Sequence, residues 1–246
     1  MRNVRIYMDT ELNQNSEAKL SGNAAHHIAQ VLRKRVGDPL VLFNGQGDEY
    51  AANIIAVSKN NVQVQVGSCS TPPTDSGLNL SLWHGLCRGG RMDSVIQKAT
   101  ELGVRLIQPV LCERGVVKLD NKKGHKRVDH WRSIAISACE QSGRNLLPEI
   151  AQPLPLANCL KLLDPACTAV LLDPSGKENL ESVVEAGKPT VVLTGPEGGF
   201  TVDEINASID AGFTAVALGP RIMRTETAPI VALGLVQYFA GDLGAS

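Results

Sequence analysis

The pattern of apolar and polar residues along this chain changes near residue 70. Before that point, short apolar runs of strand length predominate, and residues 61–66 alternate between valine and polar side chains. Strands at this spacing favour a small closed or half-open barrel. We expect strands at 4–8, 39–43, 50–57 and 61–66, and a single helix at 22–33 behind Ser21.

Beyond residue 70, runs of strand character alternate with runs of helical character. The two regimes are separated by Ser68–Gly77, a small, polar and proline-containing stretch that is typical of a linker. Alternation of this kind predicts a mostly parallel sheet covered by helices on both faces. We therefore expect two domains, residues 1–70 and 71–246. The expected elements of the second are 79–86, 91–102, 106–110, 126–141, 168–173 and 180–185, followed by two further strand and helix units.

A first loop rich in glycine and proline, Gly195–Phe200, follows the β-branched run Thr190–Thr194. A helix is predicted to start at Thr201, because Thr201 and Glu204 have the spacing of a capping box. Glycines let a ligand approach the main chain closely, although this loop alone could equally be a tight turn with no ligand. It lacks the lysine of a phosphate loop and the spacing of a dinucleotide fingerprint.

A second loop, Leu218–Ala228, repeats this design after the apolar run 213–218 and before a long apolar helix that begins near Ala228 or Pro229. Thr227 is placed to cap that helix. The polar residues 224–227 could serve only for capping and a surface ion pair. Beside another glycine loop we favour binding, since open α/β sheets bind ligands at the carboxyl ends of their strands.

These two loops, together with Glu140–Asn145 and the arrangement of the amino-terminal segment, resemble the RsmE family of 16S ribosomal RNA uridine N3-methyltransferases, which belong to the SPOUT class. The resemblance extends over essentially the whole chain. It implies a SPOUT-type trefoil-knotted α/β domain that binds S-adenosylmethionine, preceded by a small PUA-like RNA-binding barrel. It also implies methylation of a uridine at position 1498 of 16S ribosomal RNA, in the decoding region. Periodicity and spacing by themselves do not indicate a knot.

Two positions depart from the pattern of that family. Arg91 stands where a lysine is often expected, and Arg221, Ile222 and Met223 replace a more usual aliphatic run before Arg224. Arginine and lysine both neutralise phosphate, with different geometry, so contact with RNA at Arg91 stays plausible.

The reaction that the resemblance implies makes two physical demands. The N3 proton must leave the uracil, because the protonated imide nitrogen has no available lone pair, and donor and acceptor must lie in line. Backbone loops can meet the positioning demand by pairing with the edge of an adenine. The residues expected to bind the methyl donor are Leu172, Thr194, Gly195, Glu197, Gly198, Leu218, Gly219, Ile222, Met223, Thr225, Thr227 and Ala228.

Arg224 and Glu226 are the candidate catalytic residues. Arg224 could position the target base or stabilise a uracil anion electrostatically. Glu226 is the carboxylate of the second loop, and it could accept the proton or form a structural ion pair with an arginine. Loss of the proton directly to solvent is a further route.

The net charge of −1 gives no global basic signature, so RNA binding requires cations gathered on one face. Candidates for phosphate contact are Arg5, Arg33, Lys34, Arg88 and Arg91. The cations at 33–35 also end the first predicted helix, where they would offset its dipole.

The six cysteines form no CxxC pair and no cluster with histidine at metal-ligand spacing, so we expect free thiols and no metal. No apolar run reaches membrane-spanning length, and we expect a cytoplasmic protein that does not associate with membranes. The last helix is apolar on nearly every side from Ile230 to Phe239, which favours a homodimer over a central helix in a monomer. Like other members of the family it resembles, the chain is expected to act on 16S ribosomal RNA or the small ribosomal subunit.

One alternative belongs to a different class of function. The chain could be a ribosomal RNA-binding factor without enzymatic activity, in which the glycine loops are only turns. A gain in thermal stability on adding S-adenosylmethionine would discriminate, because a ligand that binds only the folded state stabilises it. Another nucleotide-dependent enzyme is disfavoured by the missing phosphate-loop lysine and dinucleotide fingerprint.

Overall fold

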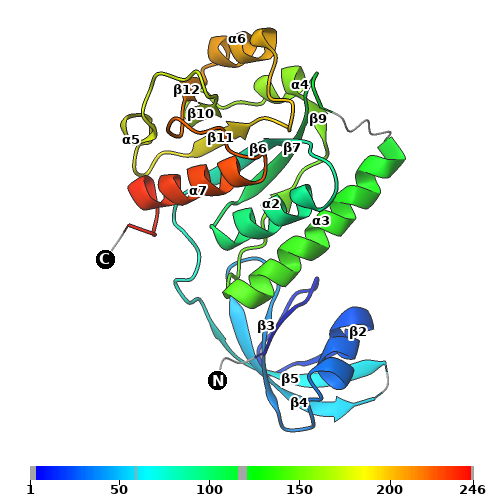
Figure 1. Cartoon of the computed structure of the whole chain (residues 1–246). Coiled ribbons are helices and arrows are strands. Elements are labelled where there is room, and N and C mark those ends of the chain that lie inside the picture. Colours follow the sequence, from blue (N-terminus) through cyan, green and yellow to red (C-terminus); the bar gives the residue numbers. More distant parts are fainter. Residues whose placement is uncertain (1–3, 59, 116–120, 245–246) are drawn as a thin grey trace. The chain divides into compact units, whose positions relative to one another are not determined.

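The computed structural model describes residues 4–58, 60–115 and 121–244 (Figure 1). The chain divides into two compact units, Met1–Asp75 with Cys139–Leu147, and Ser76–Ala138 with Pro148–Ser246. The return of residues 139–147 to the first unit is not foreseen by a single division of the sequence near residue 70.

The first unit is built on a curled sheet of five strands in the order β1-β3-β4-β5-β2. Strand β1 pairs with β3 in parallel, and the other neighbours are antiparallel. Within the described residues no ladder joins β1 to β2, so the sheet is half-open. The strands are β1 (Val4–Tyr7), β2 (Glu17–Ser21), β3 (Pro39–Phe43), β4 (Glu49–Val57) and β5 (Asn61–Ser70).

The helix predicted at 22–33 is shorter and irregular. It consists of α1 (Gly22–His26), followed by a π-helical turn, η1 (His27–Val31). Ser21 occupies the N-cap position without a side-chain capping bond, and Arg33 takes a positive φ of 52° that ends the helical path. Strand β2 was not predicted, because in Glu17–Ser21 only Leu20 is buried and the apolar signal is weak.

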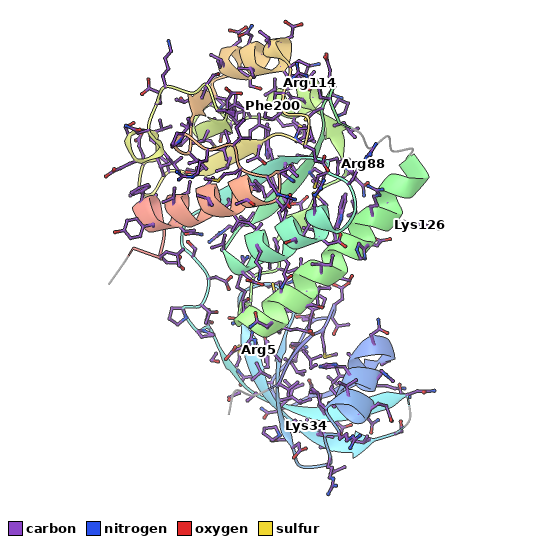
Figure 2. All side chains as sticks on the ribbon, viewed as in Figure 1. Arg5, Lys34, Arg88, Arg114, Lys126 and Phe200 are labelled. Carbon is purple, nitrogen blue, oxygen red and sulfur yellow. The ribbon has the colours of Figure 1, made fainter. Side chains whose placement is uncertain are left out.

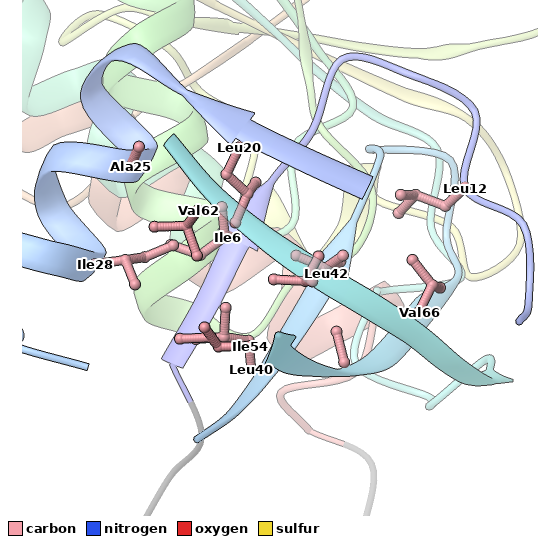
Figure 3. Close-up of a cluster of buried hydrophobic side chains, with 12 residues drawn as sticks. Ile6, Leu12, Leu20, Ala25, Ile28, Leu40, Leu42, Ile54, Val62 and Val66 are labelled. Carbon is pink, nitrogen blue, oxygen red and sulfur yellow. The ribbon is translucent and has the colours of Figure 1, made fainter. Parts of the chain in front are cut away.

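Side chains from all five strands and from the helix fill the core of this unit (Figure 3). The alternation seen in the sequence at 61–66 is confirmed, since Val62, Val64 and Val66 point inward while Gln63 and Gln65 do not. The twelve buried members are Ile6, Leu12, Leu20, Ala25, Ile28, Leu40, Leu42, Ala52, Ile54, Val62, Val64 and Val66.

A buried polar network fastens residues 139–147 within the first unit. The guanidinium of Arg5 pairs with Glu49 at 2.5 Å and donates to the carbonyl of Arg144 at 3.2 Å and to Asn145 Oδ1. Arg144 Nε in turn lies 2.8 Å from Asp75 Oδ1, and Asp75 Oδ2 accepts the Asn145 N–H at 3.0 Å. The motif at 140–145 therefore has a structural use in this unit.

The second unit contains a fully parallel sheet in the order β12-β10-β11-β6-β7-β8, with β9 also beside β7. The parallel sheet predicted from the alternating pattern is thereby confirmed. Its strands are β6 (Leu80–Gly85), β7 (Leu106–Leu111), β8 (Glu149–Ile150), β9 (Leu154–Pro155), β10 (Thr168–Leu172), β11 (Thr190–Thr194) and β12 (Thr214–Val216).

Helices cover both faces of this sheet. In Figure 1, α2 and α7 lie on one side and α4 and α6 on the other. The helices are α2 (Gly90–Glu101), α3 (Asn121–Ser142), α4 (Leu156–Leu160), α5 (Leu180–Val183), α6 (Val202–Asp210) and α7 (Thr227–Ala240). None of the described helices is long and apolar enough to cross a membrane.

Candidate functional site

A cavity of about 610 Å³ lies at the carboxyl edge of the parallel sheet, where the two glycine loops meet. Nearly all residues predicted for the methyl donor line it, together with Arg91, Arg224 and Glu226; Thr227 does not. The predicted residues in its lining are Leu172, Thr194, Gly195, Glu197, Gly198, Leu218, Gly219, Ile222, Met223, Thr225 and Ala228. Sequence reasoning missed Asp173, Pro174, Pro196, Gly199, Phe200, Val216 and Arg221.

The first loop follows β11 and is held by the start of α6. The predicted capping box is confirmed, since Thr201 Oγ1 accepts the Glu204 N–H at 3.2 Å and Glu204 Oε2 accepts the Thr201 N–H at 2.8 Å. A Cβ added to Gly195 would lie 3.2 Å from the ring of Phe200. A glycine is therefore favoured where the chain turns from the strand into the cavity wall.

A segment after β7 braces the same loop from outside. Arg114 Nη1 donates to the carbonyl of Phe200 at 3.1 Å, and Figure 2 shows the two residues side by side. Glu204 Oε1 accepts the Glu113 N–H at 2.9 Å, which ties this segment to α6. A Cβ on Gly198 would come within 2.9 Å of Arg114 Cβ. No local pattern around Arg114 signals this contact, because its partners lie more than 80 residues away.

The second loop closes onto the first. Thr225 Oγ1 donates to the carbonyl of Gly195 at 2.9 Å, while the carbonyl of Arg224 accepts the N–H groups of Thr227 and Ala228 at 2.9 and 3.0 Å. Helix α7 begins at Thr227, and its N-cap is Glu226 without a side-chain bond. The prediction that Thr227 caps this helix is wrong, because the backbone carbonyl of Arg224 accepts the first two amides instead.

Two carboxylates and one arginine form an ion-pair cluster in the wall of the cavity. Glu197 Oε1 accepts the Arg88 N–H and Arg91 Nη1, both at 2.8 Å, and Arg91 Nε lies 3.7 Å from Glu226 Oε2. Burial opposes ionisation of Glu197, but these hydrogen bonds and the charge of Arg91 outweigh it, so the pKa of Glu197 lies below its ordinary value. Glu226 Oε2 is buried and has no hydrogen-bond partner in the described part of the chain.

The candidate cations fall into three kinds of environment. Arg5 is the most buried, with a side chain 9% exposed and bound to Glu49, which favours a structural role over the predicted phosphate contact. Arg91 belongs to the cavity wall. Arg33 and Arg88 are exposed and Lys34 is half-buried, and no acceptor among the described residues binds their side chains. Figure 2 places Lys34 on the first unit and Arg88 on the second.

Arg224 also leaves its charge available. It is exposed at the mouth of the cavity, and within the described residues its guanidinium has no hydrogen-bond partner. A free cation in this place can stabilise an anion that forms in the cavity.

A buried histidine that sequence reasoning did not select lies directly beneath the first loop. His84, on β6, is 0% exposed, and its Nδ1 lies 2.5 Å from Thr194 Oγ1. Burial lowers the pKa of His84 to about 4. The six cysteines are free thiols, and no group of three or more potential metal ligands occurs among the described residues.

Two family profiles match this chain. The RNA methyltransferase domain covers residues 74–237, and the RNA methyltransferase PUA domain covers residues 20–67. Together they extend over most of the two units of the structure.

Curated relatives and solved structures agree with this assignment. Ribosomal RNA small subunit methyltransferase E of Buchnera aphidicola is 32% identical over 97% of this chain and 94% of its own length. The Bacillus subtilis protein of the same name is also 32% identical, over 95% of this chain and 96% of its own.

A Legionella pneumophila methyltransferase, solved in complex with the cofactor SAM, superposes with a TM-score of 0.95 at 37% identity, over 99% of this chain and 100% of that one. Ribosomal RNA small subunit methyltransferase E of Neisseria gonorrhoeae, bound to S-adenosyl methionine, gives 0.93 at 34% identity, over 98% and 100%. The chain belongs to the ribosomal RNA small subunit methyltransferase E family.

Proposed function

We propose that this chain transfers the methyl group of S-adenosylmethionine to N3 of a uridine in 16S ribosomal RNA. The observation that carries the proposal is the cavity formed jointly by the two glycine loops, on a fold shared with relatives whose structures hold this cofactor. Because the substrate is ribosomal RNA, we place the protein in the cytoplasm.

The cavity suits a flat, polar and cationic ligand. Much of its wall is backbone, since Gly195, Gly198 and Gly219 leave main-chain groups open to contact. Glu226 Oε2 is buried and, beyond its ion pair with Arg91, has no hydrogen-bond partner among the described residues, which matches a ligand that carries a positive charge or an N–H donor. These residues therefore fit S-adenosylmethionine.

When bound, the cofactor supplies an electrophilic methyl group. The chain's own residues have to hold the donor, orient the uracil and manage the N3 proton. Backbone groups of both loops, from Thr194 to Gly198 and from Leu218 to Ala228, bind and orient the donor. Arg224, whose guanidinium has no partner in the described part of the chain, stabilises the uracil anion as the N3 proton leaves.

Glu226 contributes mainly through its charge in this scheme. Its Oε2 lies 3.7 Å from Arg91, which also binds Glu197, so Arg91 keeps the two loops together. The N3 proton passes to solvent at the open mouth of the cavity.

RNA contact is assigned to cations on both units. Arg33 and Lys34 on the first unit and Arg88 on the second can neutralise phosphates, because no side chain in the described residues competes for them. Phosphate contacts of this kind position RNA without reading its sequence.

For the fold of the second unit we propose the trefoil knot that its family resemblance implies. The support lies in how β12 is enclosed. It pairs with β10 on one side, while Glu178 bridges Val216 on the other and Gly176 packs against the backbone of Val216. The segment leaving β10 therefore lies against β12, and Thr225, which follows β12 in the chain, bonds back to Gly195.

We also propose that the chain acts as a homodimer through α7. Ala232, Leu233 and Val236 of this helix are buried within the chain, whereas Tyr238 is 59% exposed, and Val231 and Leu235 are half-buried. An apolar helix face of this kind favours a second copy as its cover. Sedimentation that finds a monomer at micromolar concentration would remove this part of the proposal.

The test of the proposed function separates binding from chemistry. We expect Arg224→Ala to lower the rate of methylation of 16S ribosomal RNA about 100-fold or more, the cost of losing one positioned electrostatic group. Calorimetry with S-adenosylmethionine should find its affinity unchanged. Lys188→Ala, which removes an exposed cation that pairs with Glu185, is the control and should keep full activity. An equal loss of cofactor affinity in Arg224→Ala would contradict the assigned role.

A further inference from the structure

His84 lies at the carboxyl end of β6, between the two segments that leave the sheet toward the cavity. It is paired in register with Thr194, the last residue of β11. Its Nδ1 lies 2.5 Å from Thr194 Oγ1, and its Nε2 lies 3.7 Å from the sulfur of Cys87. Each ring nitrogen therefore contacts a residue that leads from a strand toward the cavity: Thr194 at the end of β11 and Cys87 just after β6.

A histidine beside a methylation site suggests a proton acceptor, but the surroundings of His84 exclude this role. The side chain is 0% exposed, and both of its nitrogens are engaged. Burial lowers its pKa to about 4, so the ring is neutral at physiological pH. Burial likewise raises the pKa of Cys87 to about 12, which keeps the thiol protonated and the contact uncharged.

The two residues that His84 contacts immediately precede the segments that carry the ion-pair cluster of Glu197 and Arg91. Thr194 leads directly into Gly195 and Glu197. Cys87 precedes Arg88, whose N–H donates to Glu197 at 2.8 Å. His84 thus links the segment after β6 to the segment after β11 through Cys87 and Thr194. Glu197 links the same two segments a second time through the Arg88 N–H.

We propose that His84 is a positioning residue for the cofactor, acting through the Thr194 hydroxyl to hold the first glycine loop in its binding conformation. This inference rests on the proposed function, because it concerns how the same cavity takes S-adenosylmethionine. Neither residue of the pair transfers a proton. Their hydrogen bond places the backbone of Thr194 and Gly195, and the cost of losing it falls on cofactor affinity.

A double-mutant cycle measured by calorimetry tests the path through Thr194. We expect His84→Leu and Thr194→Val each to weaken binding of S-adenosylmethionine about tenfold, since each leaves a buried polar partner unpaired. The double variant should bind no more weakly than either single variant, because both remove the same bond. Additive losses, about 100-fold in the double variant, or unchanged affinity in Thr194→Val, would overturn the proposal.

A matched control separates positioning from general destabilisation. Ser76 Oγ donates to Gln237 Oε1 at 2.8 Å in another buried side-chain hydrogen bond of the same unit, and neither residue lines the cavity. Ser76→Ala should lower thermal stability about as much as Thr194→Val while changing cofactor affinity by less than about twofold. If Ser76→Ala weakens the cofactor equally, the effect is global and His84 has no positioning role.

Nitrogen NMR tests the buried arrangement of His84, and kinetics separate cofactor binding from the chemical step. Nitrogen NMR of the His84 ring should report a neutral imidazole from pH 8 down to about pH 5.5, whereas titration near its ordinary pKa of about 6.5 would overturn the buried arrangement. At saturating cofactor, kcat of His84→Leu should stay within about threefold of the unmodified chain. A larger fall in kcat would place His84 in the chemistry instead. If the unmodified chain itself fails to bind the cofactor, the proposed function fails rather than this inference.

Discussion

Replacing Gly85 with alanine is expected to disable the cavity by moving one loop. Gly85 ends β6, and an ideal Cβ built there lies 2.4 Å from the nitrogen of Pro196, 2.5 Å from its Cδ and 2.8 Å from the carbonyl carbon of Gly195. Ordinary Cβ contacts begin near 3.4 Å, so the neighbour has to move by about 1 Å. The atoms in the way belong to the backbone and to a proline ring, which cannot relieve the clash by changing rotamer.

The size of the effect follows from that displacement. Forcing an extra methyl into well-packed structure costs about 1–3 kcal/mol of stability. A misplacement of about 1 Å near a reacting centre costs about 100-fold in rate. The Gly195–Pro196 peptide is part of the cavity wall, so the loss should appear first in cofactor affinity and then in turnover.

Gly90→Ala is the matched control. Gly90 is the first residue of α2, and no neighbouring atom lies within 4 Å of its built Cβ. Thermal unfolding, calorimetry with S-adenosylmethionine and methylation of 16S ribosomal RNA should each separate the two variants. If Gly85→Ala binds the cofactor as tightly as Gly90→Ala does, the close approach of Pro196 to β6 is not what shapes the cavity, and the reasoning fails.

Two further predictions concern buried ionisable groups. Because the pKa of His84 is about 4 in the folded chain and about 6.5 when unfolded, only the unfolded chain takes up a proton between these values. Stability should therefore fall as pH drops from 6.5 to 4, by about 3 kcal/mol in urea unfolding, and His84→Leu should lack this component. Asp75→Ala should cost about 3–5 kcal/mol by the same assay, since it leaves Arg144, a side chain 4% exposed, without the carboxylate that it binds; a loss below about 1 kcal/mol would contradict the importance of that pair.

The sequence predicted the parts of the fold that depend on local pattern. The parallel strands, the capping box at Thr201 and Glu204, and the meeting of the two glycine loops follow from apolar periodicity and glycine placement. Strand β2 and the short strands β8 and β9 were not predicted, because they contain few buried residues and pair with segments distant in the sequence. The knot came only from the family resemblance, and it stays a proposal.

The candidate site was predictable to the extent that its residues lie in the loops themselves. His84 and Arg114 act across the sheet and between strands, on partners 110 and 84 to 86 residues away. Nothing in their neighbouring sequence distinguishes them from core or surface residues. The phosphate contact predicted for Arg5 stays a prediction, and its neighbouring sequence does not reveal Glu49 and Asn145, which bind its guanidinium in the folded chain.

The hydrogen bond from Thr225 to Gly195 has a consequence for the order in which the molecule becomes competent. During synthesis, Gly195 emerges 30 residues before Thr225, so the first loop lacks this hydrogen bond until the second loop has been made. We expect newly made chains to acquire affinity for the methyl donor only after the second loop has emerged and closed onto the first.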